Sequence, residues 1–272
     1  MDTGLAGKVA VVTGATANIG RGVALAFADE GARVVVVGRD KAAGERVAEL
    51  ARGRGAADVL WCRTDVTVED EVTQMVATVL DAYGQIDVLV NNVGGNINVT
   101  PFVSSTPQEW RFDLDVNLMS TLYCTHRVLP HMLERGQGRI VNIGSMSALI
   151  GDRFMAVYSA AKGGVHAFTR VLALEVGKSG VTVNAVAPYG TLPEDWENET
   201  SSGSRFHPQT GLFALAIANQ ATEVTGIRRD TALARENAKP SEIGAAVVYL
   251  ASDQAAFVTG QVLQVDGGVQ LP

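Results

Sequence analysis

The sequence of 272 residues is poor in several features that mark particular classes of protein. Its two cysteines, Cys62 and Cys124, are too few and too isolated for a disulfide framework or a set of paired metal ligands, so we expect reduced thiols. Basic residues are not in excess, because 22 Lys and Arg stand against 29 Asp and Glu, a net charge of −7. This balance argues against a nucleic-acid-binding protein.

Long apolar runs and processing signals are lacking as well. Runs such as Val34 to Val37 have the length of a strand, and none approaches the roughly 18 residues of a membrane span. The N-terminus lacks the basic-then-apolar order of a signal peptide, and no stretch is rich enough in Pro, Gly or Ser to divide the chain. We therefore expect a cytoplasmic protein with no membrane partner, built as a single domain over residues 1–272.

Short β-branched runs alternate along the chain with longer helical patterns. The runs are continuous in Val and Ile rather than alternating between polar and apolar residues, which is typical of strands buried on both faces of a parallel sheet. This pattern predicts an α/β doubly wound Rossmann fold, a seven-stranded, mainly parallel sheet with helices on both faces. The predicted strands are Val9 to Thr13, Arg33 to Val37, Val59 to Arg63, Val88 to Asn91, Arg139 to Ile143, Val181 to Val186 and Val262 to Val265.

The predicted helices fill the intervals between these strands. One irregular stretch, Tyr189 to Lys239, is too long for an ordinary connection, and we interpret it as a substrate lid. The helical segments are Arg21 to Glu30, Lys41 to Arg52, Val68 to Tyr83, Gln108 to Leu133, Tyr158 to Lys178 and Ser241 to Ala251.

The turn from Thr13 to Gly22 follows the first strand and opens the first helix. Small residues there let the backbone approach a dinucleotide pyrophosphate, whose charge the free N–H groups and the positive helix end stabilise. A merely tight strand-to-helix turn is the alternative. Thr13, Gly14, Ile19 and Gly20 fit the pattern Thr-Gly-x-x-x-Gly-x-Gly, with Asn18 at the middle glycine; Asn tolerates the left-handed conformation needed there.

This turn resembles that of the classical short-chain dehydrogenases/reductases. Further marks of the family follow in order along almost the whole chain: Asp65-Val66, Asn91-Asn92-Val93-Gly94, Asn117, Ser145, Tyr158, Lys162, Pro188 and Asp266-Gly267-Gly268. The resemblance implies an NAD(P)-dependent oxidoreductase that interconverts a secondary alcohol and a ketone. It also implies binding of the cofactor by Gly14, Thr16, Asn18, Ile19, Arg39, Asp65, Val66, Asn91, Gly94, Tyr158, Lys162, Pro188 and Thr191.

The catalytic residues that the resemblance implies are Asn117, Ser145, Tyr158 and Lys162. Tyr158 and Lys162 are four residues apart, so a helix presents both side chains on one face, where the ammonium favours the phenolate. Tyr158 would act as the acid/base, Ser145 would hold the substrate oxygen, and Lys162 would also bond the nicotinamide ribose. Asn117 would help to hold a water beneath the lysine.

Several polar residues are alternatives to this assignment. Ser147 lies 11 rather than 13 residues before the tyrosine, so Ser145 is preferred. The histidines form no metal-ligand spacing, and we interpret them as ordinary helix or loop residues and expect no metal; they are His126, His131, His166 and His207.

The choice of nicotinamide cofactor depends on the end of the second strand. Gly38 stands where an acidic residue would bind the adenosine 2′-hydroxyl of NAD, and Arg39 offers a cation to a 2′-phosphate. These residues favour NADP, although NAD is possible because Arg39 could stack on adenine instead. Asp40 is interpreted as the cap of the next helix.

The substrate and the assembly are less defined. After Pro188 the family usually has glycine; here Tyr189 follows and is expected to narrow the substrate pocket, with Thr191 bonding the carboxamide. The run Asn91 to Gly95 resembles benzoate-diol dehydrogenases and suggests an NAD-dependent dihydrodiol dehydrogenase as an alternative, and a non-catalytic NAD(P)-binding regulatory protein is another. The resemblance implies a homotetramer. Leu118, Leu122 and Val128 are more apolar residues than one inward-facing stripe of their helix needs, so they could form its interface. Acidic residues beside Trp196 are expected to form the rim of the lid.

Overall fold

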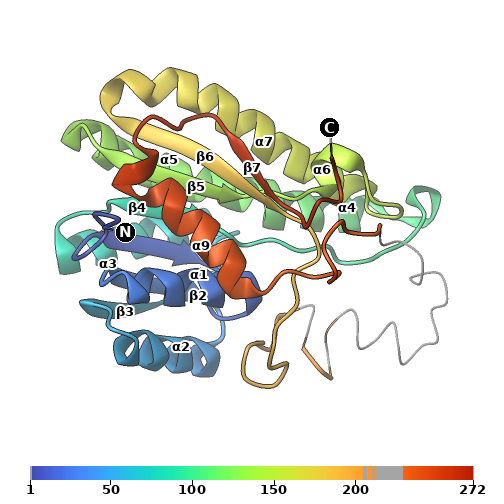
Figure 1. Cartoon of the computed structure of the whole chain (residues 1–272), viewed down its shortest axis with the longest axis horizontal. Coiled ribbons are helices and arrows are strands. Elements are labelled where there is room, and N and C mark those ends of the chain that lie inside the picture. Colours follow the sequence, from blue (N-terminus) through green and yellow to red (C-terminus); the bar gives the residue numbers. More distant parts are fainter. Residues whose placement is uncertain (1, 205–206, 210, 212–228, 272) are drawn as a thin grey trace.

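The computed structural model describes residues 2–204, 207–209, 211 and 229–271. Seven strands form one sheet in the order β3-β2-β1-β4-β5-β6-β7, and every neighbouring pair is parallel. The predicted doubly wound fold is confirmed, with a sheet that is wholly parallel (Figure 1). The strands are β1 (Val9–Thr13), β2 (Arg33–Gly38), β3 (Asp58–Arg63), β4 (Val88–Asn91), β5 (Gly138–Ile143), β6 (Val181–Pro188) and β7 (Val262–Val265).

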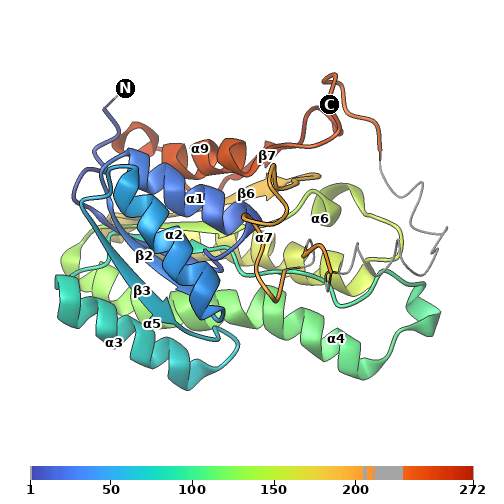
Figure 2. The same ribbon diagram turned by 90° about the horizontal axis from the view of Figure 1, so that it is seen from below.

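Helices cover both faces of this sheet. Figure 2 shows α1, α2 and α9 on one side and α3, α4 and α5 on the other. The α-helices are α1 (Asn18–Asp29), α2 (Lys41–Gly53), α3 (Glu69–Tyr83), α4 (Pro107–Leu114), α5 (Ser120–Arg135), α6 (Ser147–Ile150), α7 (Ala156–Val176) and α9 (Pro240–Ala251). Shorter 3₁₀ segments are η1 (Phe102–Ser104), η3 (Gly177–Ser179) and η5 (Asp253–Ala255), and η2 (Asp115–Met119) is a π-helix.

The alternation of side chains along each strand divides the core into two layers. On β1, Ala10 and Val12 pack with α1, α2 and α9, whereas Val9 and Val11 pack with α3, α5 and α7. Both sets are fully buried, which explains why β1 is apolar at each of these positions. Val128 belongs to the second layer and is fully buried, so it is not the surplus apolar residue that the sequence suggested.

The single helix predicted over Gln108 to Leu133 is wrong in one respect, because the π-helix η2 separates α4 from α5. Within it the N–H of Ser120 donates to the carbonyl of Asp115, five residues back rather than four. A π-turn holds one residue more than an α-turn and shifts the side chains that follow. Apolar periodicity alone does not reveal such an insertion.

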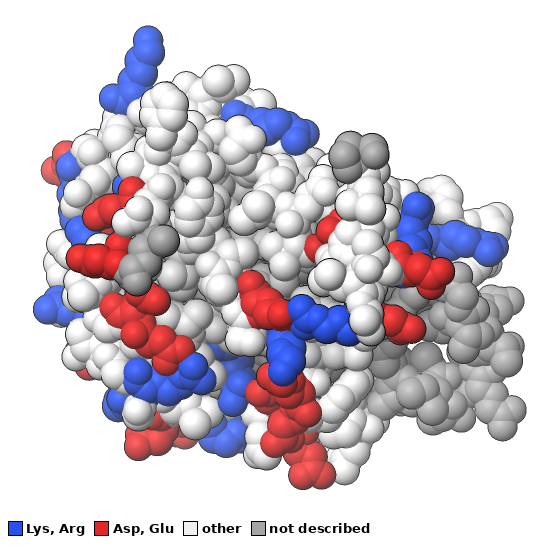
Figure 3. Space-filling model, in the orientation of Figure 1, with Lys and Arg blue, Asp and Glu red and all other residues white. Residues whose placement is uncertain are grey.

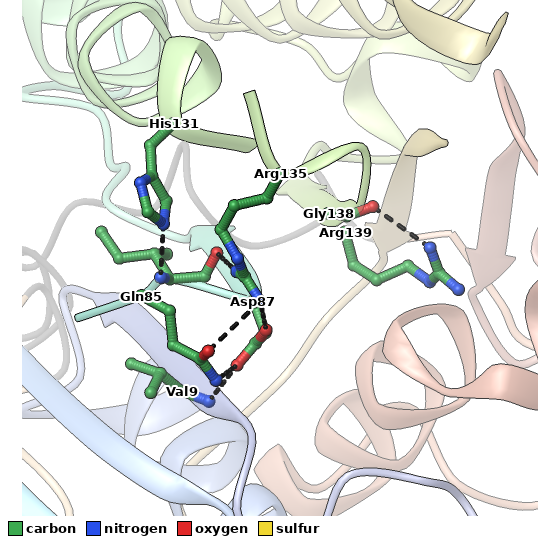
Figure 4. A network of polar contacts seen from close by, with 8 residues as sticks. Val9, Gln85, Asp87, His131, Arg135, Gly138 and Arg139 are labelled. Atoms are coloured by element: carbon green, nitrogen blue, oxygen red, sulfur yellow. Dashed lines mark hydrogen bonds and ion pairs between the residues drawn. The ribbon is translucent and has the colours of Figure 1, made fainter. Parts of the chain in front are cut away.

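A network of polar contacts lies at the amino end of the sheet, where β1, β4 and β5 begin (Figure 4). Asp87 accepts hydrogen bonds from the N–H of Val9 at 2.8 Å and from Gln85, and it pairs with Arg135 at 2.9 Å. His131 accepts the N–H of Ile86 at 3.4 Å. These contacts tie strand β4 to β1 and α5, which gives His131 the structural role expected of it.

Charges of both signs mix on one face of the molecule (Figure 3), and both thiols are buried. On the face shown in Figure 3, Lys and Arg lie beside Asp and Glu rather than in a broad region of one sign. Cys62 and Cys124 are free and buried, and burial raises the pKa of their thiols to about 11 and about 12. Among the described residues, no helix is long and apolar enough to cross a membrane.

Candidate active site

Tyr158 and Lys162 lie one turn apart on α7, and both are buried, with exposed fractions of 8% and 3%. The Nζ of Lys162 donates a hydrogen bond of 2.8 Å to the carbonyl of Ile143, the last residue of β5. The ammonium therefore lies against the carboxyl end of the sheet. Ligands of doubly wound folds bind at this edge.

Asn117 approaches the same point from the π-helix η2. Its Nδ2 donates to the carbonyl of Gly95 at 2.6 Å, and its Oδ1 accepts the N–H of Gly95 at 3.0 Å. A Cβ at Gly94 would lie 2.8 Å from the Nζ of Lys162 and 2.9 Å from the Oδ1 of Asn117. Only glycine therefore lets the chain after β4 pass so close to the lysine and the asparagine.

Ser145 follows β5 by two residues, and Ser147 supports it. The hydroxyl oxygen of Ser145 accepts the N–H of Ser147 at 3.2 Å and the hydroxyl of Ser147 at 2.9 Å. The proton of the Ser145 hydroxyl is then available for another acceptor. Ser147 is 2% exposed and lies behind Ser145 rather than competing with it.

The glycine-rich turn after β1 has the backbone that the sequence predicted. Asn18 has φ +41° and Gly14 φ +63°, so the asparagine adopts the left-handed conformation expected at the family's glycine. A Cβ at Gly20 would lie 2.1 Å from the carbonyl oxygen of Gly14, so this position must be glycine. Asn92, after β4, donates to the carbonyls of Thr13 and Gly14 at 2.9 and 3.2 Å and holds the turn.

Comparisons with known proteins agree with this geometry. The family model of short chain dehydrogenase matches residues 8–202, and that of enoyl-(acyl carrier protein) reductase matches residues 210–270. A 1,6-dihydroxycyclohexa-2,4-diene-1-carboxylate dehydrogenase of Pseudomonas putida is 37% identical over 96% of this chain and 92% of its own. The chain belongs to the short-chain dehydrogenase family. It is an NAD(P)-dependent oxidoreductase acting on CH–OH groups.

Other relatives of this short-chain dehydrogenase act on different substrates. A 3-oxoacyl-[acyl-carrier-protein] reductase of Synechocystis is 37% identical over 98% of both chains. An L-fucose dehydrogenase of Oryctolagus cuniculus is 35% identical over 98% of this chain and 86% of its own. Since relatives of similar identity differ in substrate, the comparisons define the chemistry and leave the substrate open.

The residues of this short-chain dehydrogenase fit a dinucleotide at the start of α1. The first turn of α1 holds no acidic residue, and no side chain caps it, which suits an anion at the helix N-terminus. The turn lies after β1, beside β4, where the order of the strands reverses. This switch point is the usual dinucleotide site of the fold.

The segments after β2 and β3 lie at the same end of the sheet. A Cβ at Gly38 would lie 2.6 Å from the Cγ2 of Thr16, so that no side chain fits there. Arg39 is exposed and pairs with Asp65 at 3.4 Å. Burial raises the pKa of Asp65, but hydrogen bonds from Thr67 and the nearby Arg39 outweigh it, and the pKa lies below its usual value. Asp65 is thus ionised at neutral pH.

Other predicted cofactor residues lie around this end of the sheet in different ways. The amide of Asn91 points inward and donates to Thr125 at 2.9 Å and to Asn142 at 2.8 Å, so it serves the interior. Asp40 caps α2 by accepting the N–H of Ala43 at 3.1 Å, as predicted. The remaining predicted residues lie at the ends of strands or at the start of α1: Ile19, Val66, Pro188 and Thr191.

The approach to α7 and the loop after β4 lie against each other. A cavity there is lined by apolar and aromatic side chains together with a few polar ones. Phe154 has φ +67°, an uncommon backbone for a bulky residue that often marks a functional site. The lining includes Ile97, Asn98, Trp110, Phe154, Met155 and Val157. Tyr189 directly follows β6, and its hydroxyl oxygen accepts a hydrogen bond of 2.8 Å from the N–H of Arg229.

Part of the predicted lid lies across the cofactor turn. We call residues 194–204 the strap. The carbonyl of Glu199 accepts the N–H of Asn18 at 2.8 Å, and its carboxylate pairs with Arg21 at 2.8 Å. The N–H of Ser202 donates to Asp40 at 3.0 Å. Residues 205–206, 210 and 212–228 of the predicted lid lie outside the described residues.

The acidic rim predicted near Trp196 is partly neutralised in the structure. Glu199 pairs with Arg21, and Glu194 pairs with Lys239 at 2.6 Å. These pairs leave less negative charge facing the site than the sequence suggested. In the described part of the chain, no cluster of His, Cys, Asp and Glu is arranged to hold a metal ion.

Two residues at this end of the sheet have contacts that the sequence did not predict. Asn92 was read only as part of a family motif, yet it holds the glycine turn. His166 was interpreted as an ordinary helix residue, yet it is 1% exposed and its Nε2 accepts the N–H of Ser145 at 3.4 Å. Its spacing of four residues from Lys162 was the available signal.

Proposed function

We propose that this enzyme interconverts a secondary alcohol and a ketone, with Tyr158 as the acid/base. The observation that supports it most is the burial of Lys162 one turn from Tyr158, with its Nζ at the carboxyl end of β5. A buried ammonium next to a tyrosine serves to stabilise the phenolate. A merely structural lysine would gain more from solvent.

The chemical steps of the protein follow from these positions. In ketone reduction, Tyr158 donates its phenolic proton to the carbonyl oxygen, and the hydroxyl of Ser145 donates a hydrogen bond to the same oxygen. In alcohol oxidation, the tyrosinate accepts the hydroxyl proton. When bound, NAD(P) supplies or accepts the hydride. Asn117 and Lys162 carry the proton onward to solvent through a water.

Lys162 supplies the free energy that this proton transfer needs. A tyrosine with a pKa near 10 transfers protons poorly at neutral pH, and lowering that pKa by 2 to 3 units takes roughly 3 to 4 kcal/mol. A neighbouring ammonium of low exposure provides an interaction of this order because solvent screens it little. The same ammonium would hold the nicotinamide ribose of a bound cofactor.

NADP is the cofactor that we propose. Gly38 leaves the end of β2 without a carboxylate, and Arg39 offers an exposed cation to a 2′-phosphate. Asp40 is engaged by the N–H groups of Ser202 and Ala43, which lower its pKa. We further propose that Thr191 bonds the carboxamide, that Tyr189 narrows the pocket, and that the enzyme works in the cytoplasm as a single-domain homotetramer.

A dihydrodiol dehydrogenase that uses NAD is the second candidate. Three of the relatives are named for cyclic dihydrodiols, the 1,6-dihydroxycyclohexa-2,4-diene-1-carboxylate dehydrogenase and two 2,3-dihydroxy-2,3-dihydro-p-cumate dehydrogenases that are each 34% identical. Such a substrate is a secondary alcohol, so the same residues would oxidise it. The two candidates differ in cofactor and in the shape of the substrate.

The test is a screen of both cofactors against ketones, β-ketoacyl thioesters, sugars and cis-dihydrodiols, followed by the absorbance of the reduced nicotinamide. We expect turnover with one of these classes, and Tyr158→Phe should lower kcat at least a hundredfold while NADPH still binds, because the variant keeps the ring and loses the proton. Tyr83→Phe, at the end of α3, is the matched control and should keep its rate. Retention of more than a tenth of kcat by Tyr158→Phe would contradict the role of the tyrosine.

A further inference from the structure

His166 lies on the same face of α7 as Tyr158 and Lys162, four residues beyond the lysine. It is 1% exposed, and its Nε2 accepts the backbone N–H of Ser145 at 3.4 Å. A Cβ on Gly144 would lie 2.1 Å from that nitrogen. The edge of the imidazole therefore packs closely against the backbone of Gly144 and Ser145, which follow β5.

The protonation state of the ring suits an acceptor. Burial, with the positive charges of Lys162 and Arg170, lowers the pKa of His166 to about 4. The ring is thus neutral at neutral pH. A neutral imidazole that accepts at Nε2 carries its proton on Nδ1, whereas a charged ring has no acceptor at all.

The second ring nitrogen shows that packing alone does not explain a histidine here. Nδ1 is buried, and no described residue of the chain forms a hydrogen bond with it. A buried polar group without a partner costs free energy that a leucine in the same space would avoid. What the histidine adds over leucine is the acceptor for Ser145.

We propose that His166 is a positioning residue of the reaction, whose Nε2 holds the backbone of Ser145 so that the serine hydroxyl meets the substrate oxygen. Ser147 holds the side chain of the same serine, so backbone and hydroxyl are fixed from two sides. A small misplacement of a group that contacts the reacting atoms lowers the rate strongly. This inference rests on the role proposed for Ser145.

The test compares variants that keep or remove the acceptor. His166→Gln places an amide oxygen near the position of Nε2, whereas His166→Leu fills the space with no acceptor, and His166→Asn is too short to reach the serine. We expect kcat to fall about tenfold to a hundredfold in the Leu and Asn variants and less than threefold in the Gln variant. KM should rise less than kcat falls, and Kd for NADPH should stay unchanged.

Val176→Ala, at the far end of α7 and 5% exposed, is the control for lost stability. It should lower Tm without lowering kcat. The proposal is overturned if His166→Leu keeps its kcat, if the Gln variant loses as much as the Leu variant, or if Val176→Ala loses as much. Should the Leu variant fail to fold, the comparison of Asn with Gln decides.

Ser145→Ala separates this inference from the proposed function. If it keeps its activity, the function assigned to the serine fails, and the role of His166 fails with it. If Ser145→Ala loses activity while His166→Leu keeps it, the proposed function stands and only the role of His166 is overturned. Loss in both, with rescue by Gln, supports both.

Discussion

Arg39 is the residue by which we expect this enzyme to distinguish its two possible cofactors. Arg39→Ala should raise Kd for NADPH about tenfold or more, since charge-assisted hydrogen bonds are worth roughly 1.5 to 3 kcal/mol, and it should affect NADH less. The change also frees the carboxylate of Asp65, which pairs with Arg39 and would then repel a 2′-phosphate. Titration of cofactor fluorescence measures both constants.

Lys41→Ala is the matched control because it removes the same charge from an exposed side chain two residues away. It should leave both constants within about twofold. Equal losses of NADPH and NADH binding in Arg39→Ala would mean that the guanidinium stacks on adenine. The preference for NADP would then be reversed.

Gly144 tests the close contact between β5 and α7. Gly144→Ala should lower the free energy of unfolding by about 1 to 3 kcal/mol, because its methyl group would overlap the ring of His166. In a His166→Ala background the methyl has room, so the added cost of Gly144→Ala should shrink. Urea denaturation of the two single variants and the double variant gives the coupling free energy, and additive losses would contradict the contact.

At the residue scale, spacing predicted which side chains belong together and could not give their surroundings. The structure places Tyr158, Lys162, Ser145 and Asn117 around one edge of the sheet, as their order in the sequence implies. The inward amide of Asn91 and the contact of His166 with Ser145 depend on which neighbours a fold brings together. Nothing in a single sequence reports such long-range contacts.

At the scale of elements, the strands were easier to predict than the helix that carries Asn117. Three strands have the predicted bounds, because each valine-rich run is flanked by glycine or polar residues. The π-helix was missed, although it is what brings Asn117 to Gly95. Apolar periodicity alone does not reveal its extra residue.

The strap is an element whose contacts we expect to control cofactor entry. The carbonyl of Glu199 bonds the N–H of Asn18, a donor that a pyrophosphate at this helix end would use. Glu199→Ala removes the ion pair with Arg21 and should loosen the strap. We expect the association rate of NADPH, measured by stopped-flow fluorescence, to rise about threefold or more.

Glu197→Ala removes an equal charge from the exposed side of the strap and is the control for long-range attraction of the anionic cofactor. It should raise the association rate much less. If both variants raise the rate equally, the effect is one of net charge and the strap does not control entry. An unchanged rate in Glu199→Ala would contradict the prediction directly.

At the scale of the whole molecule, the order of the strands explains where the site lies. The chain moves outward from β1 to β3, then returns to place β4 on the other side of β1. The loops after β1 and β4 therefore diverge at the switch point, and Asn92 bridges them. β5, beside β4, adds Ile143 and the approach to Ser145, so one end of the sheet holds both the glycine-rich turn and the residues for which we propose catalytic roles.

The exposed apolar face of α7 leads to a prediction about assembly. Val171 and Leu174 of α7 are 55% and 85% exposed. Phe112 and Leu114 of the neighbouring helix α4 are 43% and 38% exposed. Such exposure is unusual for large apolar side chains on two helices that contact each other. We expect a homotetramer of about 114 kDa, four chains of 28.6 kDa, by light scattering at micromolar concentration. Leu174→Glu should reduce the mass, because a charge in an apolar interface is costly. Leu50→Glu, the same change on the half-exposed face of α2, should leave the mass unaltered. A monomer mass for the unaltered chain would contradict the assembly.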